Sequence, residues 1–271
     1  MKTKHIISAL LATAGLAVGT HAYGTVSAAL PDLILGFQQS GNSTNYEADL
    51  GSVLNYTSLA PNTLVNLSSS ISASDLQSIF GSDTLTSGTV TWAAAATTGA
   101  ATKTTYVTQF DSIQTSLTPG GTVPASLFFD KSSLNSNSRY QGIQAVTTGL
   151  NGQPSLSITE TAAIPTSSAS SYSHWMGSST VNGFAAGFDA PTALSLAAGQ
   201  YSVVDLFQYG IGTTTTPGSY IGSLELSSTG GLFFTNYVPT AIPEPSVYAA
   251  LLGVATLGFV ALRARRRQAT V

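Results

Sequence analysis

The chain contains no cysteine in its 271 residues, and only 8% of its residues are charged, against about 25% in an ordinary soluble domain. The absence of cysteine excludes disulfide scaffolds, thiolate metal sites, iron–sulfur clusters and cysteine nucleophiles. Small hydroxyl residues are abundant instead, with 37 serines and 36 threonines. The 11 tyrosines, 11 phenylalanines and 2 tryptophans argue against a disordered chain, since disordered segments are poor in aromatics.

Basic residues are scarce in the central part of the chain. Residues 29–242 carry three bases, Lys103, Lys131 and Arg139, against eleven acids, which gives a net charge near −8. Nucleic-acid binding needs a basic footprint, and attraction to anionic lipid needs basic residues too. We therefore expect no nucleic-acid partner for this region.

The N-terminus has the three parts of a secretory signal peptide. Lys2 and Lys4 precede an uncharged run over residues 6–18, and small residues follow at Val26-Ser27-Ala28. This order predicts export across a membrane and removal of residues 1–28 by signal peptidase, with the cut after Ala28 or Ala29.

The C-terminus also has three parts. Pro243-Glu244-Pro245 precedes 16 uncharged residues over 247–262, and an arginine cluster then closes the tail, formed by Arg263, Arg265, Arg266 and Arg267. Sixteen helical residues span roughly 24 Å, slightly less than a typical ~30 Å hydrocarbon core, and snorkelling arginines can close that gap. The pattern predicts a short membrane helix whose arginine cluster stays cytoplasmic.

Together the three C-terminal parts resemble the PEP-CTERM sorting signal of exported proteins from exopolysaccharide-producing Gram-negative bacteria. The resemblance covers residues 241–271 and implies an exosortase-like membrane enzyme as processing partner. It implies that Pro243, Glu244 and Pro245 are the recognition motif, residues 247–262 a transient inner-membrane anchor, and the arginines a retention cluster. After cleavage near the motif, the protein would reach the cell surface or the extracellular matrix. The alternative is a permanent single-pass anchor in which Pro-Glu-Pro is coincidental.

The body between these signals, residues 29–241, has mostly β-type patterns. Strands are expected at residues 33–37, 89–92, 105–110, 156–158 and 201–209, and a hairpin pairs residues 220–226 with 232–237. A capping-box start at Ser72 predicts a helix ending at Gly81, and two weaker helical patterns cover residues 140–146 and 171–176. These patterns predict a mainly β fold, a single β-sandwich with a jelly roll as one form of it, and a few short helices. The signal peptide and the C-terminal span would flank it as helices.

The body lacks the motifs of common enzyme classes. It has no GxSxG elbow, no P-loop and no dinucleotide fingerprint, and His174 is its one histidine. Glu47 and Asp49 share one face of a strand, which we interpret as a solvated acidic edge rather than a calcium site. We expect no catalytic residue, no metal and no cofactor.

The two tryptophans are assigned different roles. Trp92 alternates with polar residues in an expected strand and is assigned to the core. Trp175 lies in a polar segment and is the candidate for contacting a sugar ring. The sequence thus predicts a structural surface or matrix protein that associates with extracellular polysaccharide. The alternative is a carbohydrate-binding or carbohydrate-active domain delivered by the same tail.

Overall fold

The computed structural model describes residues 24–99, 102–117, 133–175, 192–210 and 218–237. Its strands are β1 (Asp32–Gln39), β2 (Thr44–Ser52), β3 (Leu64–Asn66), β4 (Val90–Thr97), β5 (Thr105–Gln114), β6 (Thr161–Pro165), β7 (Thr192–Ala193), β8 (Tyr201–Tyr209), β9 (Ser219–Ser227) and β10 (Leu232–Thr235). Its helices are α1 (Val53–Thr57), α2 (Ala73–Phe80), α3 (Ser133–Leu150), α4 (Tyr172–Trp175) and the 3₁₀ turn η1 (Ser68–Ser70). The mainly β class is therefore confirmed.

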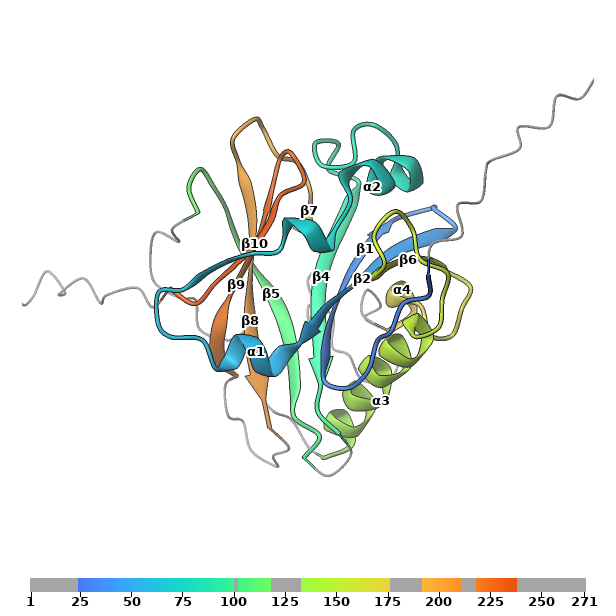
Figure 1. Ribbon diagram of the computed structural model, residues 1–271, viewed down its shortest axis with the longest axis vertical. Helices are drawn as coiled ribbons and strands as arrows, with labels where there is room; N and C mark the ends of the chain where they lie inside the picture. The colour runs from blue at the N-terminus through green and yellow to red at the C-terminus, as the bar shows by residue number, and fades with distance from the viewer. Residues whose placement is uncertain (1–23, 100–101, 118–132, 176–191, 211–217, 238–271) are drawn as a thin grey trace, which may run out of the picture.

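All the described strands belong to one antiparallel sheet. Its order is β3-β10-β9-β8-β5-β4-β1-β2-β6, and β7 pairs separately with β4. The β-sandwich prediction is not confirmed, because no second hydrogen-bonded sheet occurs among these strands. Figure 1 shows instead one strongly curled sheet, with β8, β9 and β10 on one side and β1, β2 and β6 on the other.

Side chains are buried on both faces of this sheet. The inner core fills the curl and includes Leu35, Phe37, Trp92 and Phe234. The outer core lies on the opposite face, where Ile143 of α3 and other apolar residues of that helix pack. Burial on both faces explains why β4 contains the uninterrupted apolar run 93–96, since neither face of that strand meets water.

Tyr56 of α1 joins the two ends of the curl. Its ring packs on Phe234 of β10 with centroids 4.8 Å apart, and its hydroxyl donates a 2.6 Å hydrogen bond to the Leu50 carbonyl of β2. One side chain therefore contacts strands that lie far apart in the sheet order.

Helix α2 begins and ends as its sequence predicts, whereas α3 extends beyond the predicted 140–146 at both ends and α1 was not predicted. The Ser72 hydroxyl caps α2 by accepting a hydrogen bond from the Asp75 N–H, and Gly81 at φ +99° ends the helix. Helix α3 buries Tyr140, Ile143 and other residues at three- and four-residue spacing. In Figure 1, α3 and α4 cover the outer face near β1, β2 and β4.

Most expected strands are confirmed, and one is wrong. β9 and β10 form the predicted hairpin, with Leu226 opposite Leu232, and β8 lies near the middle of the sheet as a central strand. The expected strand at 156–158 is a turn instead. The Leu156 N–H bonds to the Thr161 carbonyl and the Thr161 N–H bonds to the Ile158 carbonyl, so the chain reverses there before β6 begins.

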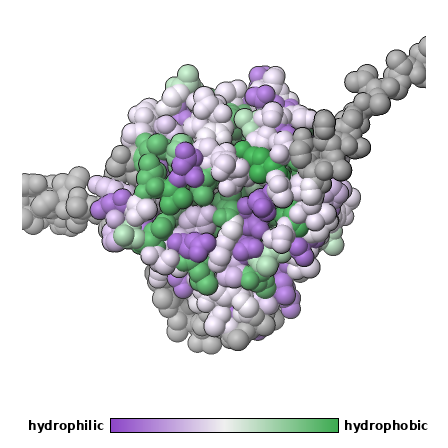
Figure 2. Space-filling model, in the orientation of Figure 1, coloured by the Kyte–Doolittle hydropathy of each residue, from purple (hydrophilic) through white to green (hydrophobic). Residues whose placement is uncertain are grey.

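Much of the face seen in Figure 2 is neither strongly hydrophilic nor strongly apolar. Figure 2 shows one face on which pale residues, the colour of serine and threonine, separate small hydrophilic and apolar areas. The exposed large apolar side chains of the described residues are Leu54, Leu64 and Ile113. Within the described residues, no helix is long and apolar enough to cross a membrane.

Candidate functional site

Most residues singled out from the sequence lie outside the described part of the chain. This applies to the predicted signal peptide up to residue 23, to the motif Pro243-Glu244-Pro245, to the expected span 247–262 and to the arginine cluster. Trp175 ends α4, but its side chain is outside the described part as well. Trp92 is fully buried in the inner core, as predicted, and its Nε1 donates a 2.9 Å hydrogen bond to the Ser202 hydroxyl.

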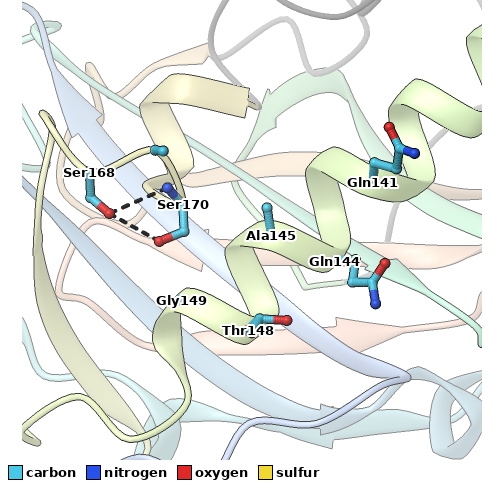
Figure 3. Close-up of a pocket in the computed structure, with 8 residues that line it drawn as sticks. Gln141, Gln144, Ala145, Thr148, Gly149, Ser168 and Ser170 are labelled. Atoms are coloured by element: carbon cyan, nitrogen blue, oxygen red, sulfur yellow. Dashed lines mark hydrogen bonds between the residues drawn. The ribbon is translucent and has the colours of Figure 1, made fainter.

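A groove of about 540 Å³ runs beside α3. Its lining is uncharged and comes from one face of α3 and from the turn after β6: Gln141, Gln144, Ala145, Thr148, Gly149, Ser168, Ala169 and Ser170. Figure 3 shows the two glutamines on the helix side and the serines on the turn side, with Ala145 between them. The volume lies within the range of about 300–1,000 Å³ usual for small-molecule sites.

The turn side of the groove is held close to the helix by small residues. The Ser168 hydroxyl accepts a hydrogen bond from the Ser170 N–H at 3.3 Å, and the two hydroxyls lie 3.0 Å apart. Ser170 packs so tightly against Gly149 that a β-carbon there would overlap its side chain. The groove therefore has a fixed wall and offers amide and hydroxyl groups to a neutral polar ligand.

The second unusual feature is a set of four buried carboxyls on the outer face of the sheet, Glu47, Asp49, Asp205 and Glu225. Their exposed fractions are 0%, 6%, 2% and 0% respectively. The prediction that Glu47 and Asp49 form a solvated acidic edge is therefore wrong. Strand alternation does place them on one face, but this is the face that α3 and α4 cover.

Glu47 lies under α4. Its Oε1 accepts a 2.7 Å hydrogen bond from the Tyr172 N–H at the start of this helix, while Oε2 has no partner. Two positions earlier on the same face, Asn45 donates from Nδ2 to the Ser173 hydroxyl at 2.8 Å, and its Oδ1 is also unpartnered. Burial raises the pKa of Glu47 to about 8, although the hydrogen bond from Tyr172 opposes this in part.

Asp49 lies at the other end of β2. Its Oδ1 accepts a 2.7 Å hydrogen bond from the Gly51 N–H. Burial raises the pKa of Asp49 to about 7, and the nearby carboxyls of Asp32 and Glu160 add to the shift. These raised values make the body less negative at neutral pH than its count of acids suggests.

Asp205 and Glu225 form the second buried group, on the neighbouring strands β8 and β9. The Ser223 hydroxyl donates a 2.6 Å hydrogen bond to Asp205 Oδ1 and lies 2.8 Å from the Tyr220 hydroxyl. Asp205 Oδ2 and both carboxylate oxygens of Glu225 have no partner. Burial raises the pKa of Asp205 to about 7 and that of Glu225 to about 8.

The sequence did not distinguish Asp205 and Glu225 from the other acids of the body and did not predict their burial. A usable signal was present, because each acid has apolar neighbours on both sides in its strand, Val204 and Leu206 around Asp205 and Leu224 and Leu226 around Glu225. In the described part of the chain, no three histidine or carboxylate side chains are grouped so as to hold a metal ion.

Comparison with known proteins gives no relative. No protein-family model, no curated protein and no solved structure matches this chain.

Proposed function

We propose that this chain is an exported surface or matrix protein, sorted and cleaved through its C-terminal tail. The observation that carries the proposal is the three-part tail, in which Pro243-Glu244-Pro245, the uncharged span 247–262 and the arginine cluster follow one another behind an N-terminal signal peptide. The processing partner would be an exosortase-like membrane enzyme. The product would be the β domain, associated with extracellular polysaccharide.

The C-terminal boundary of the sheet supports this proposal. The last strand, β10, ends at Thr235, and the next residue is anchored by its side chain. Asn236 accepts a 2.8 Å hydrogen bond from the Thr63 N–H and donates to the carbonyls of Leu59 and Ala60. The sheet therefore ends eight positions before Pro243, so a cut at the motif would remove no contact described for the domain.

The N-terminal boundary favours a cleavage point upstream of the one expected from the sequence. Val26 is 1% exposed, and its N–H and carbonyl are hydrogen-bonded to Gln153 and Gly152 respectively. Ala28 is buried in the outer core too. A cut after Ala28 would remove both residues from the domain, so we propose that the mature chain retains them.

The test is the mass of the mature protein from its native host, together with a motif variant. We expect the wild-type chain to end near residues 243–246, and the variant Pro243→Ala/Glu244→Ala to accumulate in the membrane at full length. Ser246→Ala, next to the motif, is the matched control and should be processed normally. Surface protein that still contains peptides through Arg263 would identify a permanent anchor and refute the proposal.

The groove beside α3 favours carbohydrate binding as a second candidate function. Its amide and hydroxyl groups suit a neutral sugar, because these groups can both donate to and accept from sugar hydroxyls. We expect Gln141→Ala/Gln144→Ala to weaken binding of neutral polysaccharide at least about tenfold, which corresponds to ~1.4 kcal/mol. Gln77→Ala, an exposed glutamine on α2, is the control. Equal binding by all three proteins would exclude this groove as the site.

A further inference from the structure

The strongest unassigned feature of the molecule is the pair of buried carboxyls on β8 and β9. In the antiparallel register Asp205 is opposite Ser223 and Val203 is opposite Glu225, so the two carboxyls are diagonal neighbours on one face. Diagonal cross-strand residues have β-carbons less than about 7–8 Å apart, within reach of side chains as long as glutamate. Both side chains are at least nine-tenths buried, with exposed fractions of 2% and 0%.

Among the described residues, these two carboxyls have no neutralising partner. Three of their four oxygens accept no hydrogen bond, and the fourth accepts one from the Ser223 hydroxyl, which is uncharged. No lysine, arginine or histidine of the described residues forms an ion pair with either group. Buried carboxyls without partners are neutralised by a proton or by a bound cation, so two unpaired carboxyls on adjacent strands form a candidate cation site.

A third carboxyl adds negative charge nearby. Asp111 occupies the bulge of β5, where the register with β8 shifts between Phe110 and Ser112. Its charge acts on Asp205, but its own Oδ2 already accepts hydrogen bonds from Ser112 and Gln114. Asp111 therefore strengthens the attraction for a cation, whereas Asp205 and Glu225 offer the free oxygens.

We propose that Asp205 and Glu225 bind one calcium ion between β8 and β9. Two carboxylates match the double charge of the ion, and Glu225 has both oxygens free for bidentate binding. Calcium binds six to eight oxygens in flexible geometry and accepts water among them, whereas magnesium requires near-ideal octahedral ligands. Because no third acidic or histidine side chain joins the pair in the described part of the chain, water and neutral oxygens complete the shell.

Bound calcium would connect two central strands of the sheet. An ion that binds only the folded state raises the unfolding temperature by mass action. For a chain of this size, calcium at about 100 times its dissociation constant should raise the midpoint by roughly 5–10 °C.

The experiment measures thermal unfolding of the full-length chain in mild detergent, with calcium chloride or with a chelator. We expect a saturable rise of the midpoint in the wild-type protein, no rise in Asp205→Asn/Glu225→Gln, and an unchanged rise in the control Asp83→Asn, which alters an exposed carboxyl. Magnesium chloride at equal ionic strength controls for screening. A wild-type midpoint that does not respond up to about 10 mM calcium, above the weakest usual range, overturns the proposal. A response that persists in the double variant overturns it too.

A second measurement tests the site without using the double variant, so it does not depend on whether that variant folds. Terbium replaces calcium in oxygen sites and is excited by a nearby tyrosine, and Tyr220 is linked to Asp205 through Ser223. We expect terbium emission that calcium displaces in the wild-type chain and that falls strongly in Tyr220→Phe. The absence of calcium-displaceable emission would indicate that protons, rather than a metal, neutralise the pair.

Discussion

At the residue scale, the hydroxyl side chains complete the backbone hydrogen bonding of the sheet as well as covering its surface. The Thr108 hydroxyl of β5 accepts a 2.8 Å hydrogen bond from the Ala94 N–H and lies 3.2 Å from the Ala94 carbonyl. The regular pairing of β4 with β5 begins only at Ala95, so Thr108 provides the bond that the ladder lacks. A neutral polar side chain can do this inside the core, where a charged one would be costly.

Replacing Thr108 by valine tests this role. The shape is retained, but the buried Ala94 N–H loses its acceptor, which should lower the free energy of unfolding by about 1–3 kcal/mol. Thr108→Ser keeps the hydroxyl and should recover most of that loss. Urea unfolding of the three proteins measures the difference, and equal midpoints for valine and wild type would contradict it.

Glu47 gives a pH-dependent prediction at the same scale. Its pKa is about 8 in the folded state and ordinary in the unfolded chain, so the unfolded state binds fewer protons between these values. Stability due to Glu47 is therefore fully present below the ordinary carboxyl pKa of about 4.3 and falls as pH rises toward 8. Glu47→Gln removes this pH-dependent contribution, so the free energy of unfolding of the variant relative to wild type should increase from pH 5 to pH 8.

Urea unfolding at the two pH values measures that change. Asp83→Asn, which alters an exposed carboxyl, is the matched control. A constant difference between Glu47→Gln and wild type across this range would mean that Glu47 is ionised in the folded protein.

At the element scale, the packing of α4 on β1 depends on a glycine. A β-carbon on Gly36 would overlap the ring of Tyr172, which is fully buried at the start of α4. The same helix start is fixed by the hydrogen bond from the Tyr172 N–H to Glu47, the residue opposite Gly36 on β2. Two adjacent strands thus hold the start of α4. Gly36 of β1 leaves room for the Tyr172 ring, and the Glu47 carboxyl of β2 accepts the hydrogen bond from the Tyr172 N–H.

Gly36→Ala should therefore lower stability by about 1–3 kcal/mol, because inserting a methyl group into a filled core forces its neighbours apart. Gly99→Ala is the matched control, since a β-carbon there meets no atom within 4 Å. Its effect should stay within about 0.5 kcal/mol. Similar losses in both variants would show that the Tyr172 contact does not determine the effect.

At the scale of the whole molecule, the folded unit extends upstream of the predicted signal cleavage point. A chain that starts at Gly24 keeps buried Val26 and Ala28, and a chain that starts at Ala29 loses them. Burying a valine side chain contributes about 1.5–3 kcal/mol, so the longer chain should be more stable by about this amount. Thermal unfolding of the two truncated proteins, each with the same added initiator methionine, measures this difference in stability. Equal unfolding midpoints would contradict the prediction.

The sequence by itself determined the local elements and the order of the chain's parts. Strands were predicted from the β-forming residues of 105–110, from the apolar pairs in 201–209 and from the alternation in 220–226. These signals are local, because they depend on the extended backbone alone. The capped helix from Ser72 to Gly81 followed from local hydrogen bonding and glycine's left-handed freedom. The export and sorting signals are likewise read from linear order, and their roles remain predictions.

Only the tertiary structure decided which face of each strand is covered and how the strands join. Alternation marked Glu47 and Asp49 as a polar face and predicted that it meets solvent, whereas α3 and α4 lie across it. The strands form one curled sheet, in which Tyr56 of α1 contacts both β2 and β10, segments far apart in the chain. Long-range packing has no local sequence signature, and for this reason the four buried carboxyls could be found only in the folded molecule.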